Sequence, residues 1–122
     1  MAFVALIMAL FTTIGEKPLA PAEARKAVDK EITVEMVVKS AKDRLAHRGE
    51  IYLDAEEDFR DAKNFAVVIT RAGAASLKEA GVDDPAAHFK DKTIRATGTV
   101  KLVMDVPRIE IADAKRIRIV DK

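Results

Sequence analysis

Five side chains along the sequence have the chemistry needed to hold a nucleic-acid strand. Binding of a single strand requires cations beside the phosphates and an aromatic ring on which a base can stack. Tyr52 is expected to point outward from a strand, and lysines and arginines occupy alternate, outward positions of other predicted strands. The candidate nucleic-acid-binding residues are Lys39, Tyr52, Arg95, Lys101 and Arg108.

The same cations allow a second interpretation, because lysine and arginine on strand edges also discourage aggregation. Arg71, Arg116 and Arg118 likewise either contribute to nucleic-acid binding or only protect strand edges from aggregation. The chain has 21 Lys and Arg against 20 Asp and Glu, a net charge of +1. Nucleic-acid binding would therefore need a local patch of positive charge.

The other aromatic residues that follow residue 15 are three phenylalanines. Phe59 lies in a polar loop, where it either anchors the loop by packing on the domain or offers a second stacking ring. Phe65 and Phe89 are expected in the core.

Few residues of the sequence are arranged to bind a metal ion or to catalyse a reaction. The acidic run Asp54, Glu56, Glu57, Asp58 and Asp61 lacks the spacing and the glycine of a calcium loop, and it would repel phosphates. There is no cysteine and there are only two histidines, His47 and His88, both expected as surface or capping residues. Neither serine lies in a nucleophile motif. The sequence predicts no enzyme, no metal site and no cofactor.

Hydrophobic periodicity predicts a mostly β domain with short helices. Helices are expected at Pro21 to Val28, at Ala74 to Ala80 between Gly73 and the stop signal Gly81, and from the Asp84 cap through Phe89. Lys42 to Arg48 is predicted as a charged turn, and Gly98 as a bend within a long strand. The expected strands are Glu31 to Lys39, Glu50 to Asp54, Phe65 to Thr70, Lys92 to Val103, Arg108 to Ala112 and Arg116 to Val120. The side chains expected to share one core are Ile32, Val34, Met36, Ile51, Leu53, Val67, Ile94, Val100 and Ile109.

The first fifteen residues carry no charged side chain. Their apolar run, residues 2–11, is too short to span a bilayer but has the length of the apolar part of a secretory signal. We expect a leader at residues 1–15, a linker and short helix at 16–29, and a folded domain at 30–122. If the leader is a signal, the protein is exported to the periplasm or secreted. Otherwise the segment is a terminal element packed on the domain and the protein is cytoplasmic.

Four stretches carry a resemblance to a known fold family. They are Lys30 to Ser40, Gly49 to Phe65, Phe65 to Ile69, and Phe89 to Val100 followed by Pro107 to Ile111. Residues 30–120 resemble OB-fold domains of the nucleic-acid-binding type, and look closest to short, often exported bacterial proteins of uncharacterised role. The resemblance implies a five-stranded Greek-key barrel with a helical connection between its third and fourth strands.

The expected function is that of a binding module. The first hypothesis is weak binding of single-stranded DNA or RNA through the barrel face. The alternative is an exported module that binds a protein or a small ligand and has no nucleic-acid surface. No stable membrane span is expected.

Overall fold

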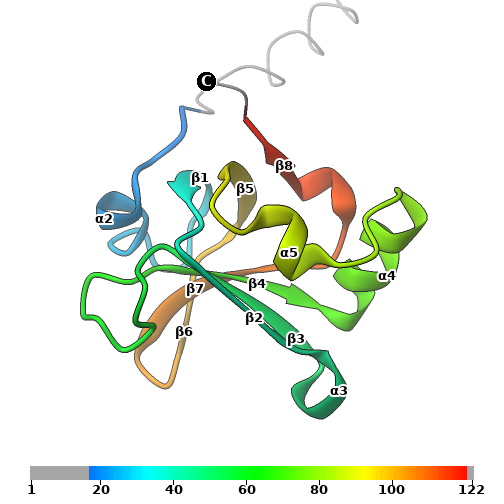
Figure 1. Cartoon of the computed structure of the whole chain (residues 1–122). Helices are drawn as coiled ribbons and strands as arrows, with labels where there is room; N and C mark the ends of the chain where they lie inside the picture. The colour runs from blue at the N-terminus through cyan, green and yellow to red at the C-terminus, as the bar shows by residue number, and fades with distance from the viewer. Residues whose placement is uncertain (1–16, 121–122) are drawn as a thin grey trace, which may run out of the picture.

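The strands pair into two sheets. The computed structural model describes residues 17–120, so the expectations for residues 1–15 lie outside the described residues. The three-stranded sheet is antiparallel, in the order β1 (Glu31–Val37), β5 (Thr93–Thr99), β8 (Ile117–Ile119). The five-stranded sheet has the order β2 (Ser40–Arg44), β3 (Glu50–Asp54), β4 (Ala66–Thr70), β7 (Val106–Ile111), β6 (Lys101–Val103), and its β4–β7 pair is parallel (Figure 1).

Two stretches of chain belong to both sheets. The chain leaves β1 at Val38, whose N–H bonds to Lys92 O beside β5, and enters β2 at Lys39, whose N–H bonds to Asp54 O of β3. The second crossing is at Val100, between β5 and β6. The expected long strand from Lys92 to Val103 is therefore divided between the two sheets. The bend predicted at Gly98 lies two residues before this crossing.

The charged turn predicted at Lys42 to Arg48 is wrong in its first half. Residues Ser40–Arg44 form β2, which pairs along its whole length with β3. Its polar composition is that of an edge strand, in which only Ala41 packs against the core. The second half forms the short helix α3 (Leu45–Arg48), which ends at Gly49 in the left-handed conformation with φ 72°.

One core joins the two sheets. Eight of the nine side chains expected there are buried, and Ile32 is partly buried against the same cluster. Phe65 and Phe89 are also in this core, as predicted. β4 is buried over four of its five residues, so both of its faces are covered. Leu102 lies beyond the crossing, on the edge strand β6, and is 52% exposed.

The helices are short. α4 starts three residues earlier than expected, because Thr70 caps it by accepting a hydrogen bond from the N–H of Gly73 at 3.1 Å. Gly73 thus lies inside the helix, while Gly81 follows its end with φ 96°, as predicted. Asp84 caps α5 by accepting from Ala87 N–H, also as predicted. The helices are α2 (Pro21–Ala24), α3, α4 (Arg71–Glu79), α5 (Pro85–Phe89) and the 3-10 turn η1 (Ala114–Arg116).

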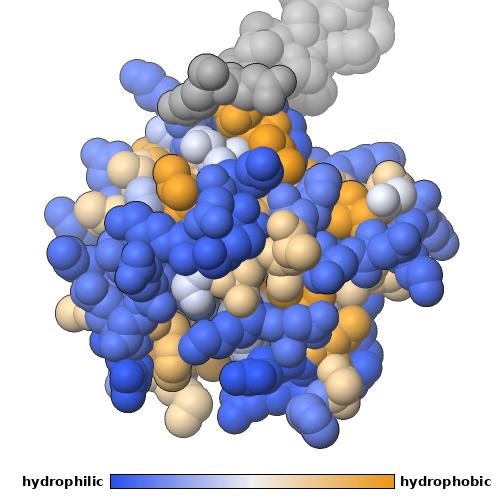
Figure 2. Space-filling model, viewed as in Figure 1, coloured by the Kyte–Doolittle hydropathy of each residue, from blue (hydrophilic) through white to orange (hydrophobic). Residues whose placement is uncertain are grey.

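The segment before β1 packs on the domain. Leu19 forms a parallel bridge with Val34, and Ala24 of α2 is fully buried. Within residues 17–120, no helix has both the length and the apolar character needed to cross a membrane. Hydrophilic residues cover most of the face seen in Figure 2, and apolar residues are scattered across it.

Candidate nucleic-acid interface

The outer face of the five-stranded sheet carries most of the predicted binding residues. Tyr52 of β3 lies between Lys42 of β2 and Val68 of β4 in the strand register. The neighbours of Tyr52 on its own strand, Ile51 and Leu53, are fully buried in the core. Because strand side chains alternate between faces, Tyr52 points outward as expected.

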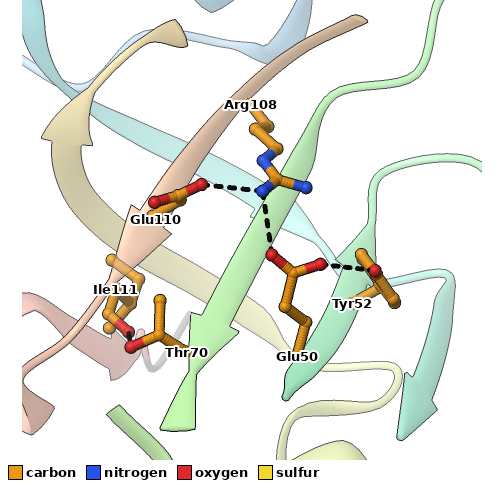
Figure 3. Close-up of polar contacts among 6 residues, drawn as sticks. All are labelled: Glu50, Tyr52, Thr70, Arg108, Glu110 and Ile111. Carbon is orange, nitrogen blue, oxygen red and sulfur yellow. Dashed lines mark hydrogen bonds and ion pairs between the residues drawn. The ribbon is translucent and has the colours of Figure 1, made fainter. Parts of the chain in front are cut away.

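The centre of this outer face is an ion-pair cluster. Arg108 Nη2 donates to Glu50 Oε2 at 2.9 Å and to Glu110 Oε2 at 2.7 Å, and Tyr52 Oη donates to Glu50 Oε1 at 2.5 Å (Figure 3). The Arg108 side chain is only 14% exposed. Val68 lies in the same row of the outer face as Tyr52 and Glu110, and it is fully buried. The predicted binding residue Arg108 is therefore already paired with two carboxylates.

The electrostatics of the cluster follow from these contacts. Burial lowers the pKa of Arg108, but the hydrogen bonds and charges of Glu110 and Glu50 outweigh it, so its pKa lies above the ordinary value. Burial and the hydrogen bond to Glu50 raise the pKa of Tyr52, against a smaller opposing effect of Arg48. The Tyr52 side chain is therefore neutral at physiological pH.

Lys42 has two aromatic neighbours. It is the cross-strand neighbour of Tyr52, and its Nζ lies 4.6 Å from the centre of the Phe59 ring. Phe59 is 53% exposed, and Arg60 also approaches its ring, at 5.8 Å. Phe59 thus shares a site with a cation on the surface instead of anchoring its loop in the core.

The acidic loop beside this site is partly neutralised. Asp58 pairs with Arg60 at 3.1 Å, and the hydrogen bonds from Arg60 lower the pKa of Asp58. Asp54 is buried, and its Oδ1 accepts a 2.9 Å hydrogen bond from Asn64 Nδ2. Burial raises the pKa of Asp54, while the Asn64 hydrogen bond and the charge of Lys42 oppose the shift.

The five predicted binding residues do not form one continuous group. Tyr52, Arg108 and Lys101 share the outer face of the five-stranded sheet, where Lys101 lies opposite Arg108 and is exposed. Lys39 lies at the crossing from β1 to β2, with its Nζ 3.8 Å from Glu56. Arg95 belongs to the other sheet, on β5, and pairs with Glu35 at 2.7 Å.

Sequence reasoning missed Lys42 and Arg44 as members of the candidate interface. Both are on β2, in register with Tyr52 and Glu50, and therefore on the outer face. The alternation of Lys42, Asp43 and Arg44 was a usable signal, but without a recognised strand it looked like a charged turn. Lys42, Arg44, Tyr52, Phe59 and Lys101 are called the outer-face group below.

The histidines and carboxylates of the described residues do not gather into a metal site. Residues 17–120 contain no cluster of three or more His, Asp or Glu side chains that could hold a metal ion. His47 is exposed on α3, and His88 is exposed on α5, where its ring packs edge-on against Phe89 at 4.7 Å.

Solved structures share this fold at low sequence identity. The asparaginyl-tRNA synthetase of Pyrococcus horikoshii matches 87% of the chain with a TM-score of 0.57 and 11% identity. The aspartyl-tRNA synthetase of Entamoeba histolytica matches 90% with a TM-score of 0.59 and 13% identity. An OBody bound to hen egg-white lysozyme matches 90% of the chain and 99% of its own length, with a TM-score of 0.58 and 16% identity.

These matches establish a likeness of fold. The matched regions are OB-fold domains, so the expected general fold is confirmed. The chain spans only 22% and 23% of the two synthetases. No protein-family model matches the sequence, and no curated protein matches it either.

Proposed function

We propose that the protein is a non-enzymatic module that binds single-stranded nucleic acid through the outer-face group. The observation that carries the proposal is the position of Lys42, a cation in register with Tyr52 and 4.6 Å from the Phe59 ring. Single-strand binding combines such stacking rings with cations that follow the backbone. Two of the proteins that share the fold are tRNA synthetases by name, which supports a nucleic-acid ligand.

The arrangement of charge on the outer face suggests how a nucleic-acid strand would lie across the sheet. Glu50 and Glu110 at the centre are matched by Arg108, so phosphates gain little there. Lys42 and Arg44 lie on the strand at one edge of the sheet and Lys101 on the strand at the other. A nucleic-acid strand that crosses the β-sheet would meet a cation at each edge of the sheet and an aromatic ring between the two edges. With a net charge of +1, we expect non-specific affinity of about 1–100 μM at physiological salt.

The test is a fluorescence-anisotropy titration with a labelled oligothymidylate at several salt concentrations. Tyr52→Leu removes a stacking ring, and we expect it to weaken binding about 5- to 150-fold, the range that one stacked base supplies. Lys42→Gln and Lys101→Gln should each reduce the salt slope by about 0.7, since each removes one phosphate contact to a single strand.

The matched control is Lys78→Gln, which removes one exposed lysine from α4, outside both sheets. It should leave both the affinity and the salt slope unchanged. Circular-dichroism melting of each variant checks that the fold is kept. Absence of binding at low salt, or equal binding by the wild type and Tyr52→Leu, would exclude this surface.

We also propose that the two sheets together form the five-stranded Greek-key barrel of an OB-fold. Residues 31–44 then count as one strand, residues 93–103 as another, and residues 106–119, interrupted by η1, as the fifth, because each passes from one sheet into the other. The parallel β4–β7 pair and the helical connection between β4 and β5 support this assignment.

A protein-interaction module is the second candidate function, and the hairpin of β6 and β7 favours it. Leu102, Met104 and Val106 are 52%, 92% and 44% exposed there, and β6 is an edge strand of the sheet within residues 17–120. Edge strands pair readily with another copy of the same chain. Sedimentation velocity over a range of concentrations tests this partner. Self-association that Met104→Ser weakens supports it, and a monomer at every concentration contradicts it.

Export through residues 1–15 is a further proposal, supported by the uncharged, apolar sequence of that segment. Mass spectrometry of the protein from its native cell checks it. A mature N-terminus near Glu16 supports cleavage, and an intact Met1 contradicts it.

A further inference from the structure

A shallow pocket on the three-stranded sheet gathers four cations. It has a volume of about 250 Å³ and is lined by Thr33, Arg95, Thr97, Lys115, Arg116 and Arg118. β1 and β5 supply the threonines and Arg95, and η1 and β8 supply the remaining cations. The outer-face group lies on the other sheet or, for Phe59, in a loop beside it, so the pocket is a separate surface.

The acidic partners account for only half of this positive charge. Arg95 pairs with Glu35 at 2.7 Å, and Arg116 pairs with Glu31 at 3.0 Å. Among the residues that the structure describes, neither Lys115 nor Arg118 has an ion-pair partner. The pocket therefore has two cations in excess.

Two of the arginines lie directly opposite each other. Arg95 and Arg118 are cross-strand partners in the β5–β8 ladder. Like charges directly opposite in a sheet are destabilising. An anion between the two guanidinium groups would replace this repulsion by attraction.

The threonine pair adds a neutral donor beside the cations. Thr33 Oγ1 and Thr97 Oγ1 are 2.8 Å apart, and one donates to the other. A single hydrogen bond uses only one of the two hydroxyl protons, so the other hydroxyl can donate to a ligand. Arginine forks and a hydroxyl donor suit the several acceptor oxygens of a phosphate group.

We propose that this pocket binds a phosphate group, held by Arg118 and Lys115 with help from Arg95 and the threonine pair. The volume is below the usual range for drug-sized ligands, which fits a small phosphate compound or one phosphate of a longer chain. The proposal is independent of the proposed function, because the two sites share no residue.

The experiment uses inorganic pyrophosphate as the probe for a free phosphate compound. We expect it to raise the melting temperature of the wild type and to shift the amide NMR signals of Thr33, Thr97 and Arg118. Arg118→Gln should weaken pyrophosphate binding about tenfold, since a charge-assisted hydrogen bond is lost. Lys115→Gln should also weaken it, Arg118→Lys should keep part of the affinity, and Lys78→Gln should not change it.

The stability of the Arg118→Gln variant in the absence of a ligand provides an independent check. Arg118→Gln removes the like-charge pair, so we expect its melting temperature in phosphate-free buffer to equal or exceed that of the wild type. This variant should therefore fold, and its loss of pyrophosphate binding can be assigned to the site.

A second arm repeats the oligothymidylate titration with Arg118→Gln and Lys115→Gln. If these variants weaken oligonucleotide binding and pyrophosphate does not bind, the phosphate comes from a nucleic-acid backbone. If pyrophosphate binds and oligonucleotide binding is unchanged, the ligand is a free phosphate compound. If neither ligand responds to the two variants, the proposal is overturned, whatever Tyr52→Leu and Lys42→Gln show on the other sheet.

Discussion

The carboxylate of Asp54 is buried, although it lies on the same outer side of β3 as Tyr52. It is 2% exposed, and its Oδ2 has no hydrogen-bond partner among the described residues. Burial raises its pKa above the ordinary value of 3.8. The folded protein therefore holds the Asp54 proton more tightly than the unfolded chain, and the ionised form reduces stability at neutral pH.

We predict that Asp54→Asn changes the pH dependence of stability. As the pH rises from about 3.8 through the raised pKa, the wild type should lose free energy of unfolding relative to the variant, and the difference should then stay constant. Urea denaturation at a series of pH values measures it. Asp58→Asn is the control of opposite sign, because the pKa of Asp58 is lowered and its ionised form stabilises the fold. Parallel profiles for the wild type and Asp54→Asn would contradict the prediction.

At the scale of single residues, the sequence predicts which side of a strand a residue occupies better than what it contacts. Strand alternation places Tyr52 and Arg108 outward, and the structure agrees. That Arg108 is paired depends on Glu50, which lies 58 residues away in the sequence. No local pattern contains the Glu50 contact, whereas Glu110 lies only two residues further along the same strand face, and its pairing with Arg108 was a local signal that the prediction did not use.

At the scale of elements, α4 approaches the end of β7 closely at Gly73. A Cβ atom added at Gly73 would lie 2.1 Å from Ile111 O of β7 and 3.1 Å from Ile69 Cγ2. Thr70 Oγ1 strengthens the same contact, since it donates to Ile111 O at 3.2 Å (Figure 3). The absence of a side chain at position 73 is therefore what allows α4 to pack against the end of β7.

We predict that Gly73→Ala lowers the free energy of unfolding. Alanine favours a helix by up to about 1 kcal/mol over glycine, but the clash with a backbone oxygen cannot be relieved by a side-chain rotation. We expect a net loss of about 1–3 kcal/mol, the usual range for overpacking. Urea denaturation checks it, with the exposed Ala72→Ser on the same helix as a control that should stay within about 0.5 kcal/mol of the wild type. A more stable Gly73→Ala variant would contradict this packing.

The same elements show where sequence patterns fail. Gly73 was expected to precede its helix because glycine is a poor helix former, but tertiary packing requires it inside. β2 was expected as a turn because its residues are mostly charged or polar. It is a strand because β3 offers it backbone partners along its whole length, and this partner lies outside the local pattern.

At the scale of the whole molecule, the chain crossings decide how surfaces are divided. The alternation along residues 92–103 puts Arg95 and Lys101 on the same side of one strand. The chain changes sheet at Val100, so the two residues lie on different sheets. The residues expected on one binding surface therefore lie on two sheets, with Tyr52 and Lys101 on one and Arg95 on the other. The crossing does not divide the core, since the nine predicted core positions pack into one cluster.

Val100 lies at one of these crossings, between β5 and β6. Its side chain is fully buried, its N–H donates to Lys30 O at 3.0 Å, and its carbonyl accepts from Asp29 N–H at 2.8 Å. We predict that Val100→Asp unfolds the domain. An unpaired buried charge costs several kcal/mol, which is comparable with a total stability of about 5–15 kcal/mol. Thr99→Asp adds the same charge one residue earlier, at an exposed position, and should remain folded. Circular dichroism and the dispersion of amide NMR signals distinguish the two outcomes. A folded Val100→Asp variant with the wild-type melting temperature would show that the core does not pass through this crossing.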